Sequence, residues 1–137
     1  LIFSEDGRYL FAVNELKSTV IAYSYDNGEL KWIDMCQVVS DDFVDKSTAA
    51  AIRIKDGYIY VSNRGEDTIA KLHLNNSKLL LEETVKCGGR SPRDFNFLGD
   101  YLLCANQDSD SVTVLDTKEN FRIFAELEVP MPICVCI

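Results

Sequence analysis

The sequence predicts an all-β chain built from repeated four-stranded antiparallel units. Runs of four to seven residues rich in Val, Ile, Leu, Tyr and Phe alternate with Asp-Gly, Asn-Gly and Asn-Asn turns, and no stretch keeps a helical period. An aromatic-rich run also ends three times at an asparagine followed by a different polar residue: Asn14-Glu15, Asn63-Arg64 and Asn106-Gln107. The asparagines lie 49 and 43 residues apart, a spacing typical of solenoids and propellers.

The first unit shows the pattern most fully. We expect strands over residues 1–4, 9–13, 19–25 and 30–39. The turns between them are the polar segments 5–8, 14–18 and 26–28, of which the last carries Asn-Gly. These elements make a four-stranded antiparallel meander.

The other units repeat this order. Ile52-Arg-Ile54 and Phe95-Asn-Phe97 match Leu1-Ile-Phe3, and each precedes a short Gly-containing turn. The predicted units, or blades, span residues 1–46, 47–91 and 92–131.

The last six residues match the start of a further unit. Pro132-Ile-Cys-Val-Cys-Ile137 aligns with Pro92-Arg-Asp-Phe-Asn-Phe97, so residues 132–137 are expected to form a first strand. A β-propeller uses such a lone strand to close its ring, which leaves no open edge. We therefore predict a partial β-propeller of about three blades plus a closing strand.

Composition excludes several classes of partner. The net charge is −8, and the 22 acidic residues are scattered, whereas nucleic acid and anionic membranes require clustered Lys and Arg. No apolar run approaches the ~20 residues that cross a bilayer, and no signal-peptide pattern is present. The expectation is a cytoplasmic protein that binds neither nucleic acid nor membrane.

The five cysteines do not form a metal motif. There is no CxxC pair and no histidine at ligand spacing, so most are expected to be reduced core thiols and no cofactor is predicted. Cys134-x-Cys136 would place two sulfurs on one strand face, but two thiolates alone do not make a zinc site.

Antiparallel geometry places the polar residues of the repeat on one face. The start of each first strand and the end of each second strand lie on the same face of a blade. We therefore expect a concave polar pocket near the ring axis. Its candidate residues are Glu15, Arg64, Arg93, Asp94 and Gln107.

The two arginines suit an anionic or carbonyl ligand. Arg64 and Arg93 can form bidentate contacts with phosphate or carboxylate. The alternative is that each pairs with an acid of the next blade, for instance Glu15 or Asp94. Glu15 is in turn either a general base that activates water or the partner of Arg64.

The remaining candidates have structural alternatives. Asn14, Asn63 and Asn106 are assigned either to ligand contacts or to turn capping with a left-handed backbone, and recurrence in all blades favours capping. Gln107 and Asp94 are left open between the two roles. His73 is expected on a strand surface and Trp32 in blade packing.

Five segments together resemble a known family. They are Gly7-Arg-Tyr-Leu-Phe-Ala-Val-Asn-Glu-Leu16, Tyr60-Val-Ser-Asn-Arg-Gly65, Ser91-Pro-Arg-Asp-Phe95, Leu103-Cys-Ala-Asn-Gln-Asp108 and Val129-Pro-Met-Pro-Ile-Cys-Val135. They resemble the seven-bladed propeller lactonases, whose namesake is the propeller-type 6-phosphogluconolactonase. The resemblance runs along the whole chain and identifies it with the C-terminal three of seven blades plus the closing strand.

The resemblance implies an activity and a site. It implies hydrolysis of 6-phosphogluconolactone to 6-phosphogluconate in the pentose phosphate pathway, without a metal. The family's site carries over to Glu15, Arg64, Arg93 and Gln107: Arg64 and Gln107 would polarise the lactone carbonyl, Glu15 or a histidine would activate water, and Arg93 would anchor the phosphate.

Two departures from the family pattern affect catalysis. The family's Arg-His pair would fall immediately before Leu1, and its Glu and His of the second blade are replaced here by Ala51 and Arg53. This chain alone is therefore expected to be inactive.

Three further expectations accompany this assignment. The alternatives to a phosphogluconolactonase are a non-catalytic propeller that binds a sugar or protein partner, and a related enzyme acting on a different lactone. Three blades alone would also leave open apolar faces and an unmatched edge, so self-association is expected.

Overall fold

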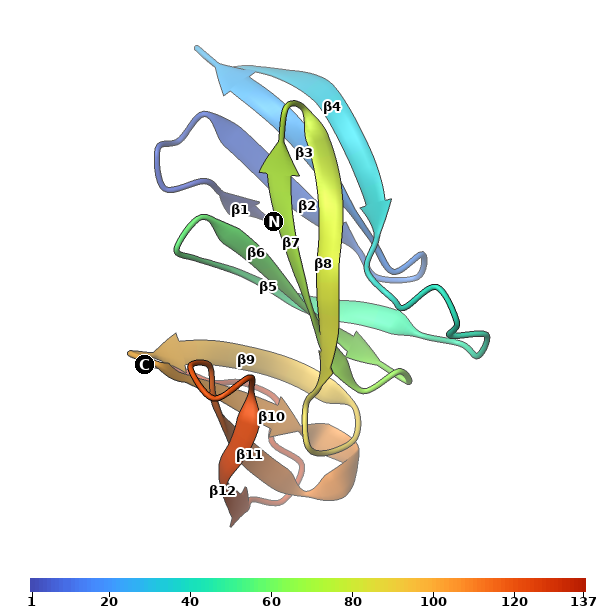
Figure 1. Ribbon diagram of the computed structural model, residues 1–137, viewed down its shortest axis with the longest axis vertical. Coiled ribbons are helices and arrows are strands. Elements are labelled where there is room, and N and C mark those ends of the chain that lie inside the picture. Colours follow the sequence, from blue (N-terminus) through green and yellow to red (C-terminus); the bar gives the residue numbers. More distant parts are fainter.

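A computed structural model describes residues 1–137, which form three four-stranded antiparallel sheets (Figure 1). Blade 1 comprises β1 (Ile2–Phe3), β2 (Tyr9–Asn14), β3 (Thr19–Asp26) and β4 (Glu29–Gln37). Blade 2 comprises β5 (Thr48–Lys55), β6 (Tyr58–Arg64), β7 (Thr68–Asn75) and β8 (Lys78–Lys86). Blade 3 comprises β9 (Pro92–Leu98), β10 (Tyr101–Asn106), β11 (Ser111–Asp116) and β12 (Arg122–Glu128), with the 3₁₀ turn η1 (Gln107–Ser109) after β10. The predicted all-β class and the meander order are confirmed.

The strands of blade 1 end differently from the prediction. β1 pairs only two residues with β2, Ile2 with Phe11 and Phe3 with Leu10. β4 ends at Gln37, although a strand to residue 39 was expected, because the buried Val38 turns its N–H to the carbonyl of Ser18 at 2.9 Å. Trp32, expected in blade packing, lies on β4 with 63% of its surface exposed.

The turn between the second and third strands has the same construction in each blade. Its last residue is Ser18, Asp67 or Asp110, and each is left-handed, with φ of 47°, 59° and 52°. Each carbonyl accepts the N–H of the residue that follows the fourth strand, at 2.9, 3.1 and 2.9 Å. The left-handed backbone expected at the repeated asparagines is thus wrong, because the turn reverses at this residue and the asparagine is still in the strand.

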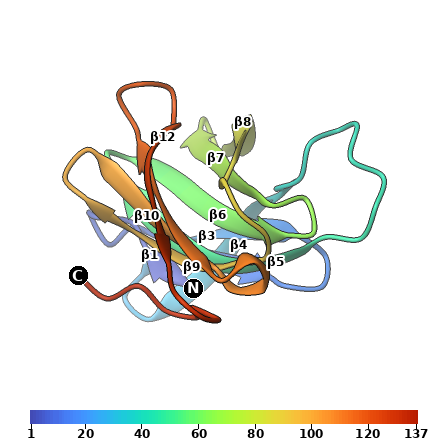
Figure 2. The same cartoon turned by 90° about the horizontal axis from the view of Figure 1, so that it is seen from below.

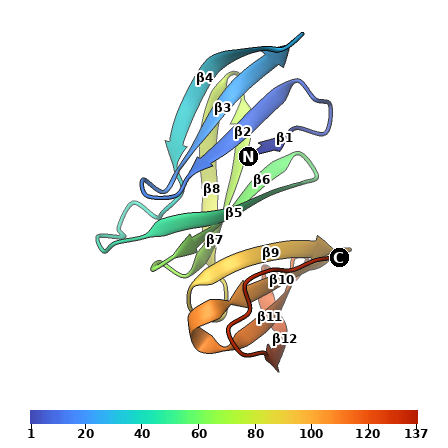
Figure 3. The ribbon, with the colours of Figure 1, turned by 180° about the vertical axis from the view of Figure 1, so that it is seen from behind.

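The blades pack face to face through two apolar cores. One lies between blades 1 and 2 and includes Phe11, Val20, Val61 and Leu72; the other lies between blades 2 and 3 and includes Phe95. Burying each such side chain contributes about 1.5–3 kcal/mol. Figures 2 and 3 show the resulting fan of three blades, in which β5 and β9 lie side by side.

The connectors between blades differ in length. Residues 38–47 join blade 1 to blade 2 with ten residues, whereas residues 87–91 join blade 2 to blade 3 with five. The longer connector projects beyond the sheets in Figure 2. It begins next to the β2–β3 turn and leads back to β5, which puts it beside the face of the molecule that carries the candidate site.

The expected strand over residues 132–137 is not formed, since residues 129–137 belong to no sheet. This segment runs beside β9, as Figure 3 shows. A strand needs a neighbouring backbone ladder, and here the segment is instead held by side chains: Val135 donates its N–H to Asp94 Oδ2 at 2.9 Å. The single helical segment, the three-residue η1, is too short to cross a membrane.

Candidate functional site

Glu15 and Arg64 meet across the boundary between blades 1 and 2. Arg64 Nη2 lies 2.5 Å from Glu15 Oε1, and the same nitrogen donates to the carbonyl of Ala49 at 3.5 Å. The Arg64 side chain is only 15% exposed, whereas that of Glu15 is 61% exposed. Glu15 directly follows β2 and Arg64 is the last residue of the equivalent strand β6, so both lie at the same end of their strands, as the repeat predicts, and the ion pair foreseen as an alternative is present.

Backbone contacts hold both partners of this pair in place. The Glu15 carbonyl accepts N–H bonds from Ser18 at 3.3 Å and from Ala49 at 3.0 Å. The Arg64 carbonyl accepts the hydroxyl of Ser47 at 3.1 Å. The guanidinium is therefore oriented by the fold, and its Nη1 has no protein partner.

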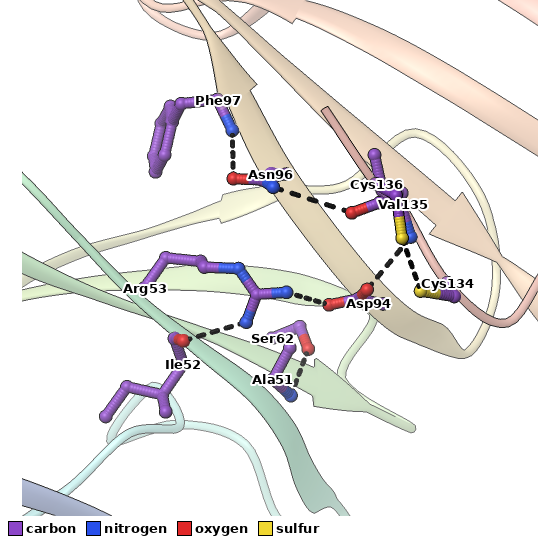
Figure 4. A network of polar contacts seen from close by, with 10 residues as sticks. All are labelled: Ala51, Ile52, Arg53, Ser62, Asp94, Asn96, Phe97, Cys134, Val135 and Cys136. Atoms are coloured by element: carbon purple, nitrogen blue, oxygen red, sulfur yellow. Dashed lines mark hydrogen bonds and ion pairs between the residues drawn. The ribbon is translucent and has the colours of Figure 1, made fainter. Parts of the chain in front are cut away.

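Asp94 and Arg53 form a second ion pair, between blades 2 and 3 (Figure 4). Arg53 Nη2 lies 2.7 Å from Asp94 Oδ1, and Nη1 donates to the carbonyl of Ile52 at 2.9 Å. The other oxygen of Asp94 accepts the N–H of Val135. Asp94, expected among the ligand contacts, therefore uses both oxygens to join β5, β9 and the C-terminal segment.

Arg53 is a residue that sequence reasoning missed as part of the site. It stands on β5, its guanidinium lies 5.7 Å from the centre of the Phe95 ring, and its side chain is 31% exposed. The one available signal was that an arginine occupies a position where the resembled family often has histidine. Its partner lies 41 residues away, and no local pattern identifies such a pair.

Arg93 remains free of the pairing that was considered for it. It is exposed on β9 and forms no ion pair, and the neighbouring Asp94 pairs with Arg53. Gln107 opens η1, where its N–H donates to the carbonyl of Ser91 at 3.1 Å. Its half-buried side chain makes no hydrogen bond within the protein. These two side chains are available to a ligand.

The repeated asparagines are turned into the blades. Asn63 and Asn106 are fully buried. Asn63 Nδ2 donates to the carbonyl of Val38, and Asn106 Nδ2 donates to the hydroxyl of Thr113 at 3.0 Å. The assignment of both as ligand contacts is therefore corrected, because no ligand reaches a fully buried amide. Asn14 is half-buried and donates to Thr19 Oγ1 at 3.0 Å, a capping contact.

Glu66 is a second residue that sequence reasoning missed. The residue is 3% exposed, and its carboxylate accepts the N–H of Ser40 at 2.9 Å, the hydroxyl of Ser40, and the hydroxyl of Thr68 at 2.7 Å. Glu66 thus fastens the long connector to blade 2. The sequence places it in a polar turn, where an acid is usually solvated, so no local signal identifies it.

All five cysteines are free thiols, and only two of them are in the core. The interaction with Cys104 lowers the pKa of the buried Cys87 thiol, and the same interaction together with burial raises the pKa of Cys104 well above its usual value. Cys134 and Cys136 are exposed with their sulfurs 3.5 Å apart, and this contact raises the pKa of Cys134. No group of three or more His, Cys, Asp or Glu side chains is placed to hold a metal ion.

The hollows of the surface are not centred on the predicted residues. One of about 290 Å³ lies beside the Glu15–Arg64 pair, under the long connector. Another, of about 500 Å³, lies between blades 1 and 2 at the opposite end of the strands, near the Ser4–Tyr9 hairpin. Neither is lined by Arg64, Arg93 or Gln107. The concave pocket expected between those three residues is thus not one of these hollows.

Three packed four-stranded sheets are the architecture of a β-propeller, and in this propeller arginines form ion pairs with acids of the neighbouring blade. The model of the family described as "Lactonase, 7-bladed beta-propeller" matches residues 1–137. The chain belongs to this family of seven-bladed β-propeller lactonases.

Relatives of known sequence support the assignment. An uncharacterized protein of Staphylococcus saprophyticus is 35% identical over 146 residues, which cover 98% of this chain and 42% of the relative. The 6-phosphogluconolactonase of Bacillus subtilis is 33% identical over 147 residues, again covering 98% of this chain and 42% of the relative. The chain therefore spans about two fifths of the length of these relatives.

Solved structures have the same fold. A periplasmic gluconolactonase of Pseudomonas aeruginosa superposes with a TM-score of 0.85 at 28% identity, over 96% of this chain and 39% of that one. A protein of Lactobacillus plantarum superposes with a TM-score of 0.87 at 28% identity, over 97% of this chain and 42% of that one.

Proposed function

We propose that residues 1–137 are three consecutive blades of a seven-bladed propeller that hydrolyses a lactone. The observation that carries this proposal is the Glu15–Arg64 pair at the boundary between blades 1 and 2. The Arg64 side chain is largely buried there, and its Nη1 has no protein partner. The family assignment and the B. subtilis 6-phosphogluconolactonase support the reaction class. As the substrate we propose 6-phosphogluconolactone, in the cytoplasmic pentose phosphate pathway.

The chemistry follows from the charge that develops during hydrolysis. Attack of water on the lactone carbonyl places negative charge on its oxygen, and donors fixed in advance stabilise that charge most effectively. Arg64 offers Nη1, and Gln107 offers an unbonded amide. Glu15 keeps Oε2 free of protein partners, so it can hold a substrate hydroxyl or orient the attacking water while Oε1 holds Arg64.

The negative charge of the substrate needs a cation, and Arg93 supplies one. Its guanidinium is exposed and unpaired on β9, in a chain with a net charge of −8. A guanidinium binds phosphate in a bidentate manner. Arg93 therefore anchors the phosphate of the substrate in this proposal.

The general base does not come from these blades. The one histidine, His73, lies on β7 with its Nδ1 3.0 Å from Glu82 Oε1, and its ring lies edge-on to the Tyr58 ring of the same blade. The position of the family's second-blade histidine is occupied by Arg53, which is committed to Asp94. In this proposal the base belongs to the rest of the ring, and the three blades alone do not catalyse.

The test is acid release from 6-phosphogluconolactone above the spontaneous rate, measured with the complete propeller that contains these blades. Arg64→Ala is expected to lower kcat by about 10²–10³, the cost of losing one oxyanion donor. Arg93→Ala is expected to raise KM. Arg8→Ala is the matched control, because Arg8 is exposed at the opposite end of the strands and pairs only with Asp6. Wild-type kinetics in both the Arg64 and the Arg93 variants would sink the assignment.

A second candidate is a propeller that binds a sugar or protein partner without turnover. The Arg53–Asp94 pair favours it, because two residues at the inner strands are engaged with each other and leave no free base there. In that case 6-phosphogluconate would bind to the complete protein, and its binding would depend on Arg93. The lactone would disappear at the spontaneous rate.

A further inference from the structure

Two exposed thiols on the segment of residues 129–137 form a pair that the proposed function does not use. Cys134 and Cys136 are free cysteines, and their sulfur atoms lie 3.5 Å apart. The other three cysteines differ from this pair, because Cys87 and Cys104 are buried and the half-buried Cys36 places its sulfur on the carbonyl of Gln37. Only at positions 134 and 136 do exposure and a neighbouring thiol occur together.

The backbone between these two thiols is held in place by side chains of β9. Val135 donates its N–H to Asp94 Oδ2 at 2.9 Å, and its carbonyl accepts Asn96 Nδ2 at 3.5 Å (Figure 4). Asp94 is itself fixed, because its other oxygen pairs with Arg53 and its side chain is only 13% exposed. Both backbone polar groups of the residue between the cysteines are thus engaged, and the two sulfurs are close before any reaction begins.

This arrangement suits chemistry that two thiols complete by themselves. A structural zinc ion needs four ligands, and no group of three or more His, Cys, Asp or Glu side chains is placed to hold a metal ion. A reacting group joined to its partner by a short linker has an effective concentration on the order of millimolar or more. Formation of a disulfide within the pair is therefore favoured over reaction of either thiol with a second molecule.

We propose that Cys134 and Cys136 are a redox modification site, which a low-molecular-weight disulfide such as oxidised glutathione converts to an intramolecular disulfide. One cysteine thiolate first attacks the glutathione disulfide, which forms a mixed disulfide and releases a glutathione thiolate. The second cysteine thiolate then attacks the protein sulfur of that mixed disulfide and releases the other glutathione thiolate. The protein dithiol loses two electrons and two protons, the glutathione disulfide gains both electrons, and the released thiolates take up the protons.

The two cysteines are assigned different steps of this reaction. The contact with Cys136 raises the pKa of Cys134, and the carboxylate of Asp94 adds to the effect. A raised pKa leaves less thiolate, which is the attacking form. Cys136 therefore attacks the incoming disulfide, and Cys134 carries out the intramolecular step, in which proximity compensates for its smaller fraction of thiolate.

The first experiment treats the native complete propeller with a large excess of oxidised over reduced glutathione and analyses its peptides by mass spectrometry. The peptide that contains residues 132–137 is expected to lose two hydrogens and to carry no stable glutathione. Cys36 is the internal control, because a thiol without a thiol neighbour can only form the glutathione adduct. A stable adduct on Cys134 or Cys136, or a pair that stays reduced, would overturn the proposal.

Single variants separate the two steps. Each remaining cysteine can only stop at the mixed disulfide, so Cys134→Ser and Cys136→Ser are both expected to accumulate the glutathione adduct. Cys36→Ser is the matched control and should form the intramolecular disulfide as the wild type does. In the wild type, samples quenched early should carry the transient adduct on Cys136, and a transient adduct on Cys134 would overturn the assigned order.

A second reagent tests the proximity of the thiols without oxidation. Phenylarsine oxide condenses with two neighbouring thiols, forming two arsenic–sulfur bonds and releasing one water. The wild-type propeller should retain it through gel filtration and lose the reactivity of Cys134 and Cys136 toward iodoacetamide, whereas neither single variant should retain it. Equal retention by the single variants would overturn the pairing. Neither reagent involves the lactone, so a propeller without lactonase activity would refute the proposed function and leave this site in place.

Discussion

The repeated asparagines show how one residue type serves different local needs. In blade 2, Asn63 is fully buried and bridges its own strand to the connector through the Val38 carbonyl, whereas in blade 1 Asn14 is half-buried and contacts only Thr19. The variable residue that follows each asparagine has different partners: Glu15 pairs with the mostly buried Arg64, and Gln107 keeps its amide free. The constant member of the motif is structural, and the variable member is available for chemistry.

Substituting these asparagines should have unequal effects on stability. Asn63→Ala leaves the buried Val38 carbonyl without its side-chain donor, so a loss of about 1–3 kcal/mol in the free energy of unfolding is expected. Asn14→Ala, the matched control, removes a half-buried contact and should cost less. Urea unfolding of the variants measures the difference. Equal losses of unfolding free energy in the two variants would mean that the burial of the asparagine does not determine the cost of its removal.

Thiol chemistry tests the placement of the cysteines. Under native conditions iodoacetamide should alkylate the exposed Cys134 and Cys136, while the buried Cys87 and Cys104 react only after unfolding. The raised pKa of Cys134 means that less thiolate is present at a given pH. The rate of its alkylation should therefore keep rising at pH values above the usual pKa of a thiol. Mass spectrometry of labelled peptides gives the rates. Rapid native labelling of Cys104 would contradict the described core.

At the scale of elements, the connectors and turns determine which side chains lie beside the Glu15–Arg64 pair. The three blades share one strand order, but only the connector of residues 38–47 is long enough to build a wall beside the Glu15–Arg64 pair. Its path depends on Gly65, which is left-handed at φ +104° and touches the Lys46 backbone. A small residue in blade 2 thus sets the position of a segment that belongs to neither sheet.

Gly65→Ala should therefore disturb more than its own turn. Any L-residue at this φ is strained by about 1–2 kcal/mol, and the added Cβ would also displace the Lys46 carbonyl. Gly57→Ala is the matched control, because Gly57 is also left-handed, at φ +78°, but has open space around it. Denaturant unfolding should show a larger loss for Gly65→Ala. A loss no greater than that of Gly57→Ala would show that the connector moves freely.

Elements and long-range contacts differ in how far the sequence predicts them. Alternation and turn residues predict the meander, and the repeat predicts that Glu15 and Arg64 share a face. The Arg53–Asp94 pair and the buried Glu66 depend on partners 41 and 26 residues away, and no local pattern encodes such partners. The expected strand over residues 132–137 is a related case, since its pattern suits a strand but a strand also requires a neighbour to pair with.

At the scale of the whole molecule, the chain exposes large apolar side chains on both outer blades. Trp32 and Met35 on β4 are 63% and 54% exposed, and Phe124 and Leu127 on β12 are 60% and 53% exposed. Large exposed apolar patches on a soluble protein mark contacts with other protein, and these side chains are the candidates for such contacts. In the proposed ring, further blades would cover part of this surface.

The isolated chain of residues 1–137 is accordingly expected to self-associate. Sedimentation velocity should show a weight-average coefficient that rises with concentration, because copies cover one another's apolar faces. The double variant Trp32→Ser with Phe124→Ser should shift the distribution toward monomer, while the exposed but isolated Val44→Ser should not. A stable monomer over the whole concentration range would contradict the expectation.

The unequal connectors also bear on how a propeller can acquire a new specificity. The entropic cost of closing a loop grows only logarithmically, so doubling a connector from five residues to ten costs about 0.6 kcal/mol. That is less than the contribution of a single buried core side chain. A propeller can therefore rebuild the wall beside the Glu15–Arg64 pair by altering one loop, with its blades and their ladders untouched, and residues 38–47 are the segment in which such a change would cost least.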